Sequence, residues 1–538
     1  MENKMKLTHF LGDVLLLAVT VGCTGGKTGT EDEETDSLSA DTVPTEEPLR
    51  YLPDTAYASA EAVTFTVEDE DSVEHPLRDF DDRYAASDNV CVFRKNLLRD
   101  GHFGGRVKGT PSEIEVDWIF QTAYDTTRTR FGTWGGGTGW TGQPIYVHWT
   151  PADTTAFRQS SPGLTDDFSD EEVMVGSLCG KAYFLNFHTG RASRTHIDLR
   201  NVVKGSMSLD PEYKNLYFGQ GVPRHEPGTF GHGAIDLLRH EITFFFGPDP
   251  RAWRGWNAFD SNAIVAGGYL FWCGENGGLY KYERSQGSLR RISVLRYRFG
   301  GAMAPGIESS LCVYRNYGFF SDNQGNIVCV NLNNMHPVWH VKNLDDSDGT
   351  IVCRVEQGTP YLYTACEVDK QGTQGKCRFL KLRALDGTTV WERLIDCNRV
   401  DLGAKVLDGG MYSTPLLGQG DCDSIIFANI CRNSAHPDRG QLTAIRTTDG
   451  SIKYTVGYGN FCWSSPVGLT NDDQQFFIFT ADANGVVYLV RGIDGQVLCR
   501  KAMGANFESS PCVVGNSIVV GCRGTKIYKF RIKNRETP

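Results

Sequence analysis

The chain has 538 residues, of which 40% are hydrophobic, 22% are charged and 60 are glycine. This composition excludes a disordered chain, and a glycine content of about 11%, against an average of about 7%, indicates many tight turns. The net charge of −11 argues against a nucleic-acid partner, and no apolar run reaches the roughly 18 residues that a membrane-spanning helix needs.

The N-terminus carries the pattern of an export signal. Lys4 and Lys6 precede an apolar stretch over residues 14–21, which ends at Gly22-Cys23. A basic flank followed by a short apolar run and small residues is typical of a secretory signal. A Cys at this place resembles the lipidation site of bacterial lipoproteins. We therefore expect residues 1–23 to be a lipoprotein-type signal peptide with Cys23 lipidated; a simply secreted protein is the alternative.

Two segments without repeats follow the signal. Residues 24–48 hold one Lys and eight acidic residues, a composition that cannot bury a core, so we expect a disordered acidic tether. Residues 49–111 contain short apolar runs at 62–67 and 90–94 and are interpreted as an irregular N-terminal segment. The expected location is the bacterial cell envelope, at its periplasmic or outer-membrane face, with the membrane touched only through the lipid anchor.

Residues 112–122 have the pattern of a β-strand that precedes every complete repeat. Glu113–Phe120 alternates polar and apolar residues and contains Trp118. We predict that this strand completes the last repeat, which ends without an outer strand of its own. The alternative is an independent strand on a separate N-terminal lobe.

A stretch rich in glycine and aromatic residues follows at 131–140. Its glycines allow close approach of the backbone, and Trp134 and Trp140 could form a stacking platform, for instance for a sugar ring. The alternative interpretation is a packed loop that plugs one end of the fold.

The rest of the chain is an eightfold repeat of a glycine turn that leads into an alternating strand. Successive copies begin 39 to 65 residues apart, at Gly180, Gly233, Gly278, Gly325, Gly375, Gly440, Gly485 and Gly524. Three copies continue into Asp-Gly, the strongest short hairpin signal, at residues 386–387, 449–450 and 494–495. We expect the ring that follows such a turn, as Trp391 does, to lie over the neighbouring sheet.

Each unit opens with small hydroxyl residues and proline. The clear cases are Tyr412–Pro415, Trp463–Pro466 and Glu508–Pro511, and looser forms occur at residues 141–144, 259–262 and 302–305. Small residues suit a crowded strand start near an axis. Together, the three elements predict an all-β fold over residues 112–538: an eight-bladed β-propeller of four-stranded antiparallel blades, closed by the strand at 112–122.

The remaining Cys and His residues give no clear metal or disulfide signal. Cysteines other than Cys23 are spread singly through apolar runs, as small buried residues are. A disulfide between Cys422 and Cys431, which flank a predicted strand, is one pairing left open. His225, His232 and His240 could bind a metal, but no carboxylate stands at ligand spacing, so we interpret them as part of a loop.

The three repeat elements resemble the pyrroloquinoline-quinone-type β-propeller repeat. The resemblance rests on the Ser-Ser-Pro opening, the Gly-x-Leu-Tyr strand and the Asp-Gly-x-x-x-Trp turn, and covers about residues 112–533. It implies the propeller fold but not an activity. The superfamily includes quinoprotein dehydrogenases and also cofactor-free propellers, such as the lipoprotein subunit of the outer-membrane β-barrel assembly machinery.

The resemblance suggests where a ligand would bind. Quinoprotein alcohol dehydrogenases use an adjacent Cys-Cys pair, which this chain lacks, and hold Ca²⁺ through oxygen ligands. Residues that the repeat places at the axial end of the inner strands are the candidates here. With the two Trp of the glycine-rich stretch, the candidate binding residues at the channel mouth are Trp134, Trp140, Asp260, Tyr412, Trp463 and Glu508; we predict no catalytic residue and no metal ligand.

We therefore expect a non-catalytic propeller lipoprotein that acts as a protein-interaction scaffold in the cell envelope, for instance in outer-membrane protein assembly. The expected partner is an envelope protein or a glycan, and no cofactor is expected. Two alternatives stay open: a glycan-binding propeller, and a dehydrogenase of alcohols or sugars that uses pyrroloquinoline quinone (PQQ) with calcium. The contact elements would be the insertions near residues 219–255, 366–376 and 431–440.

Overall fold

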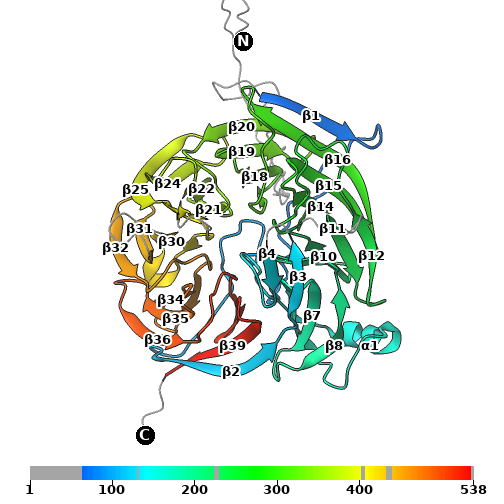
Figure 1. The fold of residues 1–538 in the computed structure, drawn as a ribbon, viewed down its shortest axis with the longest axis horizontal. Helices are drawn as coiled ribbons and strands as arrows, with labels where there is room; N and C mark the ends of the chain where they lie inside the picture. The colour runs from blue at the N-terminus through cyan, green and yellow to red at the C-terminus, as the bar shows by residue number, and fades with distance from the viewer. Residues whose placement is uncertain (1–62, 130–131, 223–229, 402–405, 432–438, 535–538) are drawn as a thin grey trace, which may run out of the picture. The chain divides into compact units, whose positions relative to one another are not determined.

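Eight antiparallel sheets form a ring of blades around one axis (Figure 1). The computed structural model describes residues 63–129, 132–222, 230–401, 406–431 and 439–534. Within these ranges the elements are almost all strands, and the one α-helix, α1 (Pro151–Ser160), lies between the first two strands of blade 1. The predicted all-β, eight-bladed propeller is confirmed.

The blades follow one another in chain order, each from its inner to its outer strand. Blades 1 to 4 consist of β5 (Ile145–His148), β6 (Glu171–Gly176), β7 (Lys181–Asn186) and β8 (Ala192–Asp198); β9 (Ser208–Leu209), β10 (Asn215–Gly219), β11 (His232–Asp236) and β12 (Glu241–Phe246); β13 (Ile264–Ala266), β14 (Tyr269–Cys273), β15 (Gly278–Ser285) and β16 (Ser288–Phe299); β17 (Cys312–Tyr314), β18 (Tyr317–Ser321), β19 (Asn326–Asn331) and β20 (His336–Lys342).

Blades 5 to 8 continue the same pattern. They consist of β21 (Val352–Glu356), β22 (Thr359–Ala365), β24 (Gln374–Arg383) and β25 (Thr389–Asn398); β29 (Leu416–Leu417), β30 (Ile425–Cys431), β31 (Gly440–Arg446) and β32 (Ile452–Gly457); β33 (Val467–Thr470), β34 (Phe476–Ala481), β35 (Val486–Arg491) and β36 (Val497–Ala502); β37 (Cys512–Val514), β38 (Ser517–Gly521), β39 (Lys526–Lys533) and β2 (Glu113–Gln121). Short pairs outside this scheme are β3 (Asp125–Thr129) with β4 (Gly132–Gly135), β23 (Glu367–Val368) with β28 (Gly409–Gly410), and β26 (Val400–Asp401) with β27 (Val406–Leu407).

The ring is closed by β2, which supplies the outer strand of blade 8. It pairs antiparallel with β39 from Glu113 opposite Lys533 to Gln121 opposite Lys526. Asp117 adds an ion pair to Lys529, with 3.0 Å between the carboxylate oxygen and Nζ. The expected closure by an N-terminal strand is therefore confirmed, and the separate lobe is not found. Closure matters because it leaves no blade with an uncovered face.

A belt of hydrogen bonds around the axis explains the hydroxyl residues that open each unit. The Asn262 backbone N–H donates to Ser310 Oγ at 2.9 Å, and the Ser310 N–H donates to Thr350 Oγ1 at 3.0 Å. The Thr414 N–H donates in the same way to Ser465 Oγ at 3.0 Å. At these junctions one blade thus binds the next through a small hydroxyl, whereas blade 3 binds blade 2 through the Asn262 side-chain amide, which donates to Ser206 O at 3.1 Å.

The predicted opening of the fourth unit was wrong. Residues 302–305 were assigned to it, but β17 begins at Cys312, directly after Glu308–Leu311, and Ser310 takes the belt position. The assignment failed because Leu311 stands where the clear motifs have Pro. Pro305, six residues earlier, was therefore taken as the Pro of the motif.

Aromatic rings on the outer strands cover the glycine turns of the next blade. Gly450 has φ +70°, and a Cβ there would lie 2.6 Å from the ring of Trp391, whose Nε1 donates to Thr447 O at 2.9 Å. Trp118 of β2 covers Gly190 in the same way and donates to Phe187 O at 2.9 Å. The expectation that these rings lie over the neighbouring sheet is confirmed.

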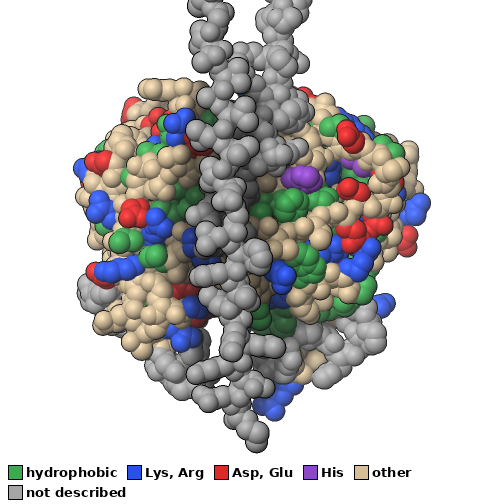
Figure 2. All heavy atoms as spheres, turned by 90° about the horizontal axis from the view of Figure 1, so that it is seen from above, with side chains coloured by type: hydrophobic (Ala, Val, Ile, Leu, Met, Phe, Trp, Pro, Cys, Tyr) green, Lys and Arg blue, Asp and Glu red, His purple; other side chains and the backbone are tan. Residues whose placement is uncertain are grey.

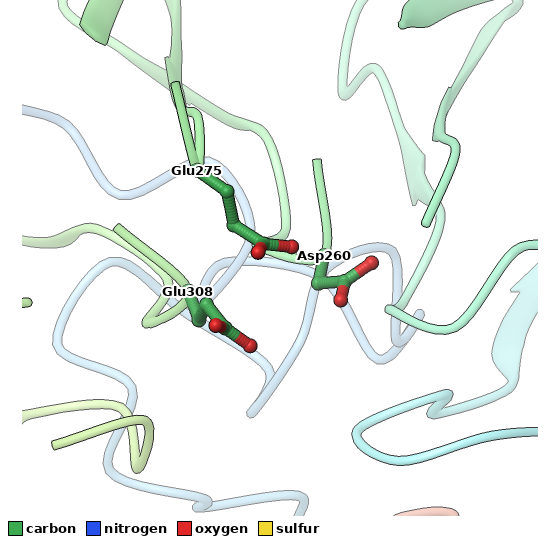
Figure 3. A group of neighbouring side chains, drawn as sticks. All are labelled: Asp260, Glu275 and Glu308. Carbon is green, nitrogen blue, oxygen red and sulfur yellow. The ribbon is translucent and has the colours of Figure 1, made fainter. Parts of the chain in front are cut away.

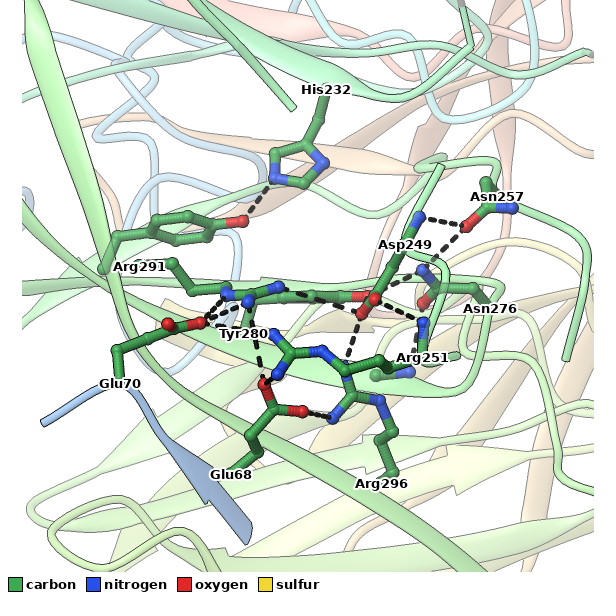
Figure 4. A network of polar contacts seen from close by, with 12 residues as sticks. Glu68, Glu70, His232, Asp249, Arg251, Asn257, Asn276, Tyr280, Arg291 and Arg296 are labelled. Carbon is green, nitrogen blue, oxygen red and sulfur yellow. Dashed lines mark hydrogen bonds and ion pairs between the residues drawn. The ribbon is translucent and has the colours of Figure 1, made fainter. Parts of the chain in front are cut away.

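The segment at 49–111 contains a strand that extends blade 3. β1 (Val63–Asp69) pairs antiparallel with β16 as a fifth, outermost strand. Its Glu68 meets Arg296 at 2.6 Å between Oε2 and Nη1, and its Glu70 accepts from Arg291 Nε at 2.7 Å (Figure 4). Arg296 in turn pairs with Asp249 at 2.6 Å. We call this network the β1 clasp.

Residues 90–107 of the same segment fill the axis of the ring. Their backbone bonds to the inner strands of several blades: Val313 N donates to Leu97 O at 2.8 Å, and Cys353 N donates to Leu98 O at 2.9 Å. Arg94 is fully buried and donates to the carbonyl of Pro466 at 2.8 Å. The inner strand edges, which would otherwise expose unpaired groups, are thereby covered.

The apolar core lies between the facing sides of neighbouring blades, for example where Phe479 of blade 7 meets Phe530 of blade 8 with 5.8 Å between ring centroids. On the described surface in Figure 2, basic and acidic side chains are interspersed. Within the described ranges, none of the helices has the length and apolar character needed to cross a membrane.

Two of the three predicted insertions can be compared with the structure. Residues 219–255 were expected to form a contact loop, but residues 232–246 are the regular hairpin of β11 and β12 in blade 2, so this part of the insertion was wrongly predicted. Residues 366–376 include β23, which lies beside blade 6 rather than in blade 5. Residues 432–438, nearly all of the third insertion, lie outside the described residues.

Candidate functional site

Eight residues at one repeat position surround the end of the axis where the inner strands begin, which we call the channel mouth. Each stands two residues before the belt position of its blade. They are Thr141, Lys204, Asp260, Glu308, Asp348, Tyr412, Trp463 and Glu508. The turns between second and third strands reach the same end and add Glu275, Glu367 and Arg523.

Three carboxyl groups converge on one side of the mouth. Asp260, Glu275 and Glu308 each offer an oxygen, and these oxygens all lie within 4.8 Å of one another (Figure 3). The first two side chains are buried. Lys204 forms an ion pair with Asp260, and its Nζ lies 4.0 Å from Glu275 Oε1. A lysine ammonium group therefore already stands among these carboxyl groups.

Burial and crowding change the protonation of this group. Burial first, and then the charges of Asp260 and Asp346, raise the pKa of Glu308 to about 7, against the opposing effect of Lys204. Burial and the charge of Glu308 raise the pKa of Glu275 well above its usual range. Against its burial, Lys204 has a raised pKa because Asp260 and Glu275 are so close. Lys204 is thus charged, and the three carboxyl groups together carry fewer than three negative charges.

A second set of three carboxyl groups lies farther along the channel mouth. Asp346, Asp348 and Glu367 also bring one oxygen each within 4.8 Å. Lys370 pairs with Asp346 at 3.0 Å and is half-exposed. Burial raises the pKa of Asp348 and of Glu367 well above the ordinary values, and the charges of neighbouring acids add to this effect.

Three of the predicted binding residues form an aromatic group beside the second set of acids. The rings of Tyr412 and Trp463 stack with centroids 5.0 Å apart, and Trp140 Nε1 donates to Tyr412 O at 3.3 Å. The Tyr412 hydroxyl also hydrogen-bonds Glu367. Trp140 and Trp463 keep part of their surface exposed, so a ligand can reach the edge of this group.

The other three predicted residues are linked through cationic side chains. Trp134 has Lys204 Nζ 6.0 Å from its ring centroid and the Arg523 guanidinium at 5.6 Å. Lys204 connects it to Asp260, and Arg523 lies 3.7 Å from Glu508. All six predicted residues therefore lie around the channel mouth. Their role in binding stays a prediction.

Sequence reasoning missed most of the acids. Glu308 and Asp348 occupy the same repeat position as Asp260, but the predicted openings did not include residues 308–311 or 348–351. The Glu-Ser-Ser sequence at 308–310, identical to that at 508–510, was the available signal. Glu275 and Glu367 lie in turns with no shared motif, and only the folded ring brings them to the mouth.

The loop interpretation is confirmed for His240, which lies in the turn after β11, but is wrong for His232. His232 lies on β11 rather than in a loop, is fully buried, and has its pKa lowered to about 3 by burial; its Nε2 lies 2.6 Å from Tyr282 OH. His225 lies outside the described residues. Cys422 lies in the short 3-10 helix before β30 and Cys431 is the last residue of that strand, so the disulfide left open between them would have to span the strand.

Comparison with known proteins adds only structural similarity. No protein-family model matches the chain, and no curated protein matches it. The quinohemoprotein alcohol dehydrogenase of Comamonas testosteroni superposes with a TM-score of 0.57 and 11% identity, covering 85% of this chain and 82% of that one. A quinohemoprotein alcohol dehydrogenase of Pseudomonas putida gives 0.56 and 12%, covering 85% and 83%.

BamB of Moraxella catarrhalis is also similar, with a TM-score of 0.46 and 14% identity over 70% of this chain and 97% of that one. At these sequence identities, the structural similarity shows the fold and does not show an activity, a ligand or a partner. The eight blades, the ring closure and the similarity to the two dehydrogenase structures lead to one conclusion: the chain has the PQQ-like β-propeller fold.

Proposed function

We propose that this protein is a non-catalytic binding propeller whose channel mouth receives a basic side chain of another cell-envelope protein. The observation that carries the proposal is the excess of carboxyl groups over cationic side chains in the mouth. The six carboxyl groups of the two sets face three cationic side chains: Lys204, Lys370 and Arg254, whose charge acts to lower the pKa of Glu308. An added lysine or arginine would find partners there without displacing an existing pair.

The raised pKa values explain why a cation would bind. Glu308, Asp348 and Glu367 hold their protons in part because like charges crowd them in a poorly solvated place. An arriving cation lowers the cost of ionising these groups, so they release protons as it binds and form new ion pairs with it. The partly exposed rings of Trp140 and Trp463 would add cation–π contacts.

Affinity purification from envelope extract tests this proposal. The full chain is used as bait, beside a double variant that replaces Asp348 by Asn and Glu367 by Gln. The matched control replaces Asp449 by Asn, in a hairpin turn at the opposite end of blade 6. We expect wild type and control to retain the same partner, which salt releases, and the mouth variant to lose it. Equal retention by all three would exclude the mouth.

A quinone dehydrogenase is the second candidate, favoured by the hard-oxygen set of Asp260, Glu275 and Glu308. The residues present do not fit a calcium-bound quinone as they stand. The ammonium group of Lys204 is paired with Asp260 and near Glu275, where a divalent ion would have to lie. The chain also has no adjacent Cys pair. We therefore derive no step of catalysis through such a cofactor.

Reconstitution separates the two candidates. The purified chain is incubated with PQQ and Ca²⁺ and then tested for visible absorption and for reduction of an artificial dye by alcohols or sugars. Binding without catalysis predicts that neither signal exceeds that of a variant with Asp260 replaced by Asn. Dye reduction that depends on Asp260 would establish the enzyme and contradict the proposal.

The envelope location is part of the proposal and rests on residues 1–48 of the sequence. Replacing Cys23 by Ser removes the proposed lipidation site. Metabolic labelling with a fatty acid should mark the wild type and not this variant, which should appear in the soluble envelope fraction. Labelling of both would show that Cys23 is not the anchor.

A further inference from the structure

Two buried cysteines from neighbouring blades are in direct contact. Cys431 is the last residue of β30 in blade 6, and Cys462 lies just before blade 7. The Cys431 thiol donates to Cys462 O at 3.3 Å, and the Cys462 backbone N–H donates to Cys431 Sγ at 3.4 Å. The two thiol groups also hydrogen-bond each other. Both residues are fully buried.

The local backbone holds this contact in place. Cys431 pairs directly with Gly440 across blade 6, and a Cβ on Gly440 would lie 2.6 Å from Cys462 Sγ. Glycine at this position therefore leaves the room in which the second sulfur sits beside the first. A larger residue would push Cys462 away from Cys431.

We propose that Cys431 and Cys462 form a disulfide that joins blade 6 to blade 7. Each thiol gives up its hydrogen, and a bond forms between the two sulfur atoms. The two electrons and two protons pass to an external disulfide, which is reduced to two thiols. An exported chain meets such oxidants in an oxidising compartment; the chemistry itself needs only the oxidant and the contact.

Burial decides when the bond forms and how long it lasts. In the folded chain, burial and the contact with Cys431 raise the pKa of Cys462 well above its ordinary value, so little thiolate is present to attack a disulfide. The bond therefore forms while the blades are still assembling. Once the ring has closed, the same burial protects it from reductants.

The bond would fix the wall of the channel mouth. Cys462 directly precedes Trp463, and Cys431 pairs with Gly410, two residues before Tyr412. Trp463 thus adjoins Cys462 along the chain, and Tyr412 follows closely on the residue that pairs with Cys431. A covalent link between blades 6 and 7 would hold these two rings in register.

Peptide mapping tests the proposal. The full chain is refolded with oxidised glutathione, and free thiols are blocked before digestion without reductant. The digest includes a protease that cuts before Asp423, because Cys422 would otherwise share a peptide with Cys431. We expect a linked pair of peptides that contain Cys431 and Cys462, and their separation after reduction. Both cysteines recovered with the blocking group attached, or either linked elsewhere, would overturn the proposal.

Variants and native reduction complete the test. Cys431→Ser should abolish the linked pair, while Cys499→Ser, a partly exposed thiol on β36, should leave it unchanged. Should the first variant fail to fold, reduction of the oxidised wild type gives the second measurement. Dithiothreitol should leave the bond intact in native buffer and cleave it in denaturant. Cleavage at equal rates in both would contradict a bond buried between the blades.

Discussion

The carboxyl group of Glu308 should make the protein less stable as the pH rises. Its pKa is about 7 in the folded chain against an ordinary 4.5, because of burial and the nearby charges of Asp260 and Asp346. A raised carboxyl pKa stabilises the folded state below pH 4.5 and loses that contribution as the pH rises to 7. The full difference corresponds to about 3 kcal/mol, and partial exposure of the side chain reduces it to about 2 kcal/mol.

Glu308→Gln removes the ionisable carboxyl group and should therefore remove this loss of stability at higher pH. At pH 4.5 the variant and the wild type should differ little in their free energy of unfolding. At pH 8 the variant should be more stable by about 2 kcal/mol, since it buries no charge. Urea titrations followed by tryptophan fluorescence at both pH values measure this. A variant that is destabilised equally at pH 4.5 and pH 8 would refute the reasoning, since Glu308 would then act through fixed hydrogen bonds.

Three further predictions concern the closure, the lysine of the mouth and the β1 clasp. Trp118→Ala should lower the free energy of unfolding by about 3–5 kcal/mol, whereas Ile119→Ala, half-exposed on the same strand, should cost less than about 1 kcal/mol; equal losses would contradict the docking of Trp118. Lys204→Met removes the ammonium group from among Asp260, Glu275 and Glu308 and should create a terbium site, detected by luminescence, that the wild type lacks. Terbium binding to both proteins would show that Lys204 does not prevent a metal ion from binding there. Replacing Glu68 and Glu70 by Gln should speed hydrogen exchange in β1 by roughly tenfold and leave β39 unchanged; uniform acceleration would indicate global destabilisation instead.

The fold could be predicted because each blade repeats the same local signals. The glycine before the third strand occurs eight times, and Asp-Gly turns and hydroxyl openings accompany it in several units. Each of these signals acts within a few residues, so a single sequence displays it. The strand at 112–122 could be placed because the last unit lacked an outer strand. The role of residues 90–107 could not, since a segment that lines eight inner strands has no period of its own.

The candidate site was predicted in part, for the same reason. Asp260, Tyr412, Trp463 and Glu508 share a repeat position, so an alignment of the units finds them. Glu275 and Glu367 come from turns whose sequences differ, and their approach to the first group depends on the closed ring. The contact between Cys431 and Cys462 likewise joins two blades, whereas the pairing first considered, with Cys422, used only nearness to one strand.

The most direct test of the proposed function is photo-crosslinking from the channel mouth in intact cells. A photoreactive phenylalanine derivative is placed at Trp463, and in a second strain at Val497, which is exposed on the outer strand of the same blade. The account predicts a cross-linked envelope protein from position 463 and none from 497. A cross-link from 497 alone would show that the outer face, and not the channel mouth, meets the partner.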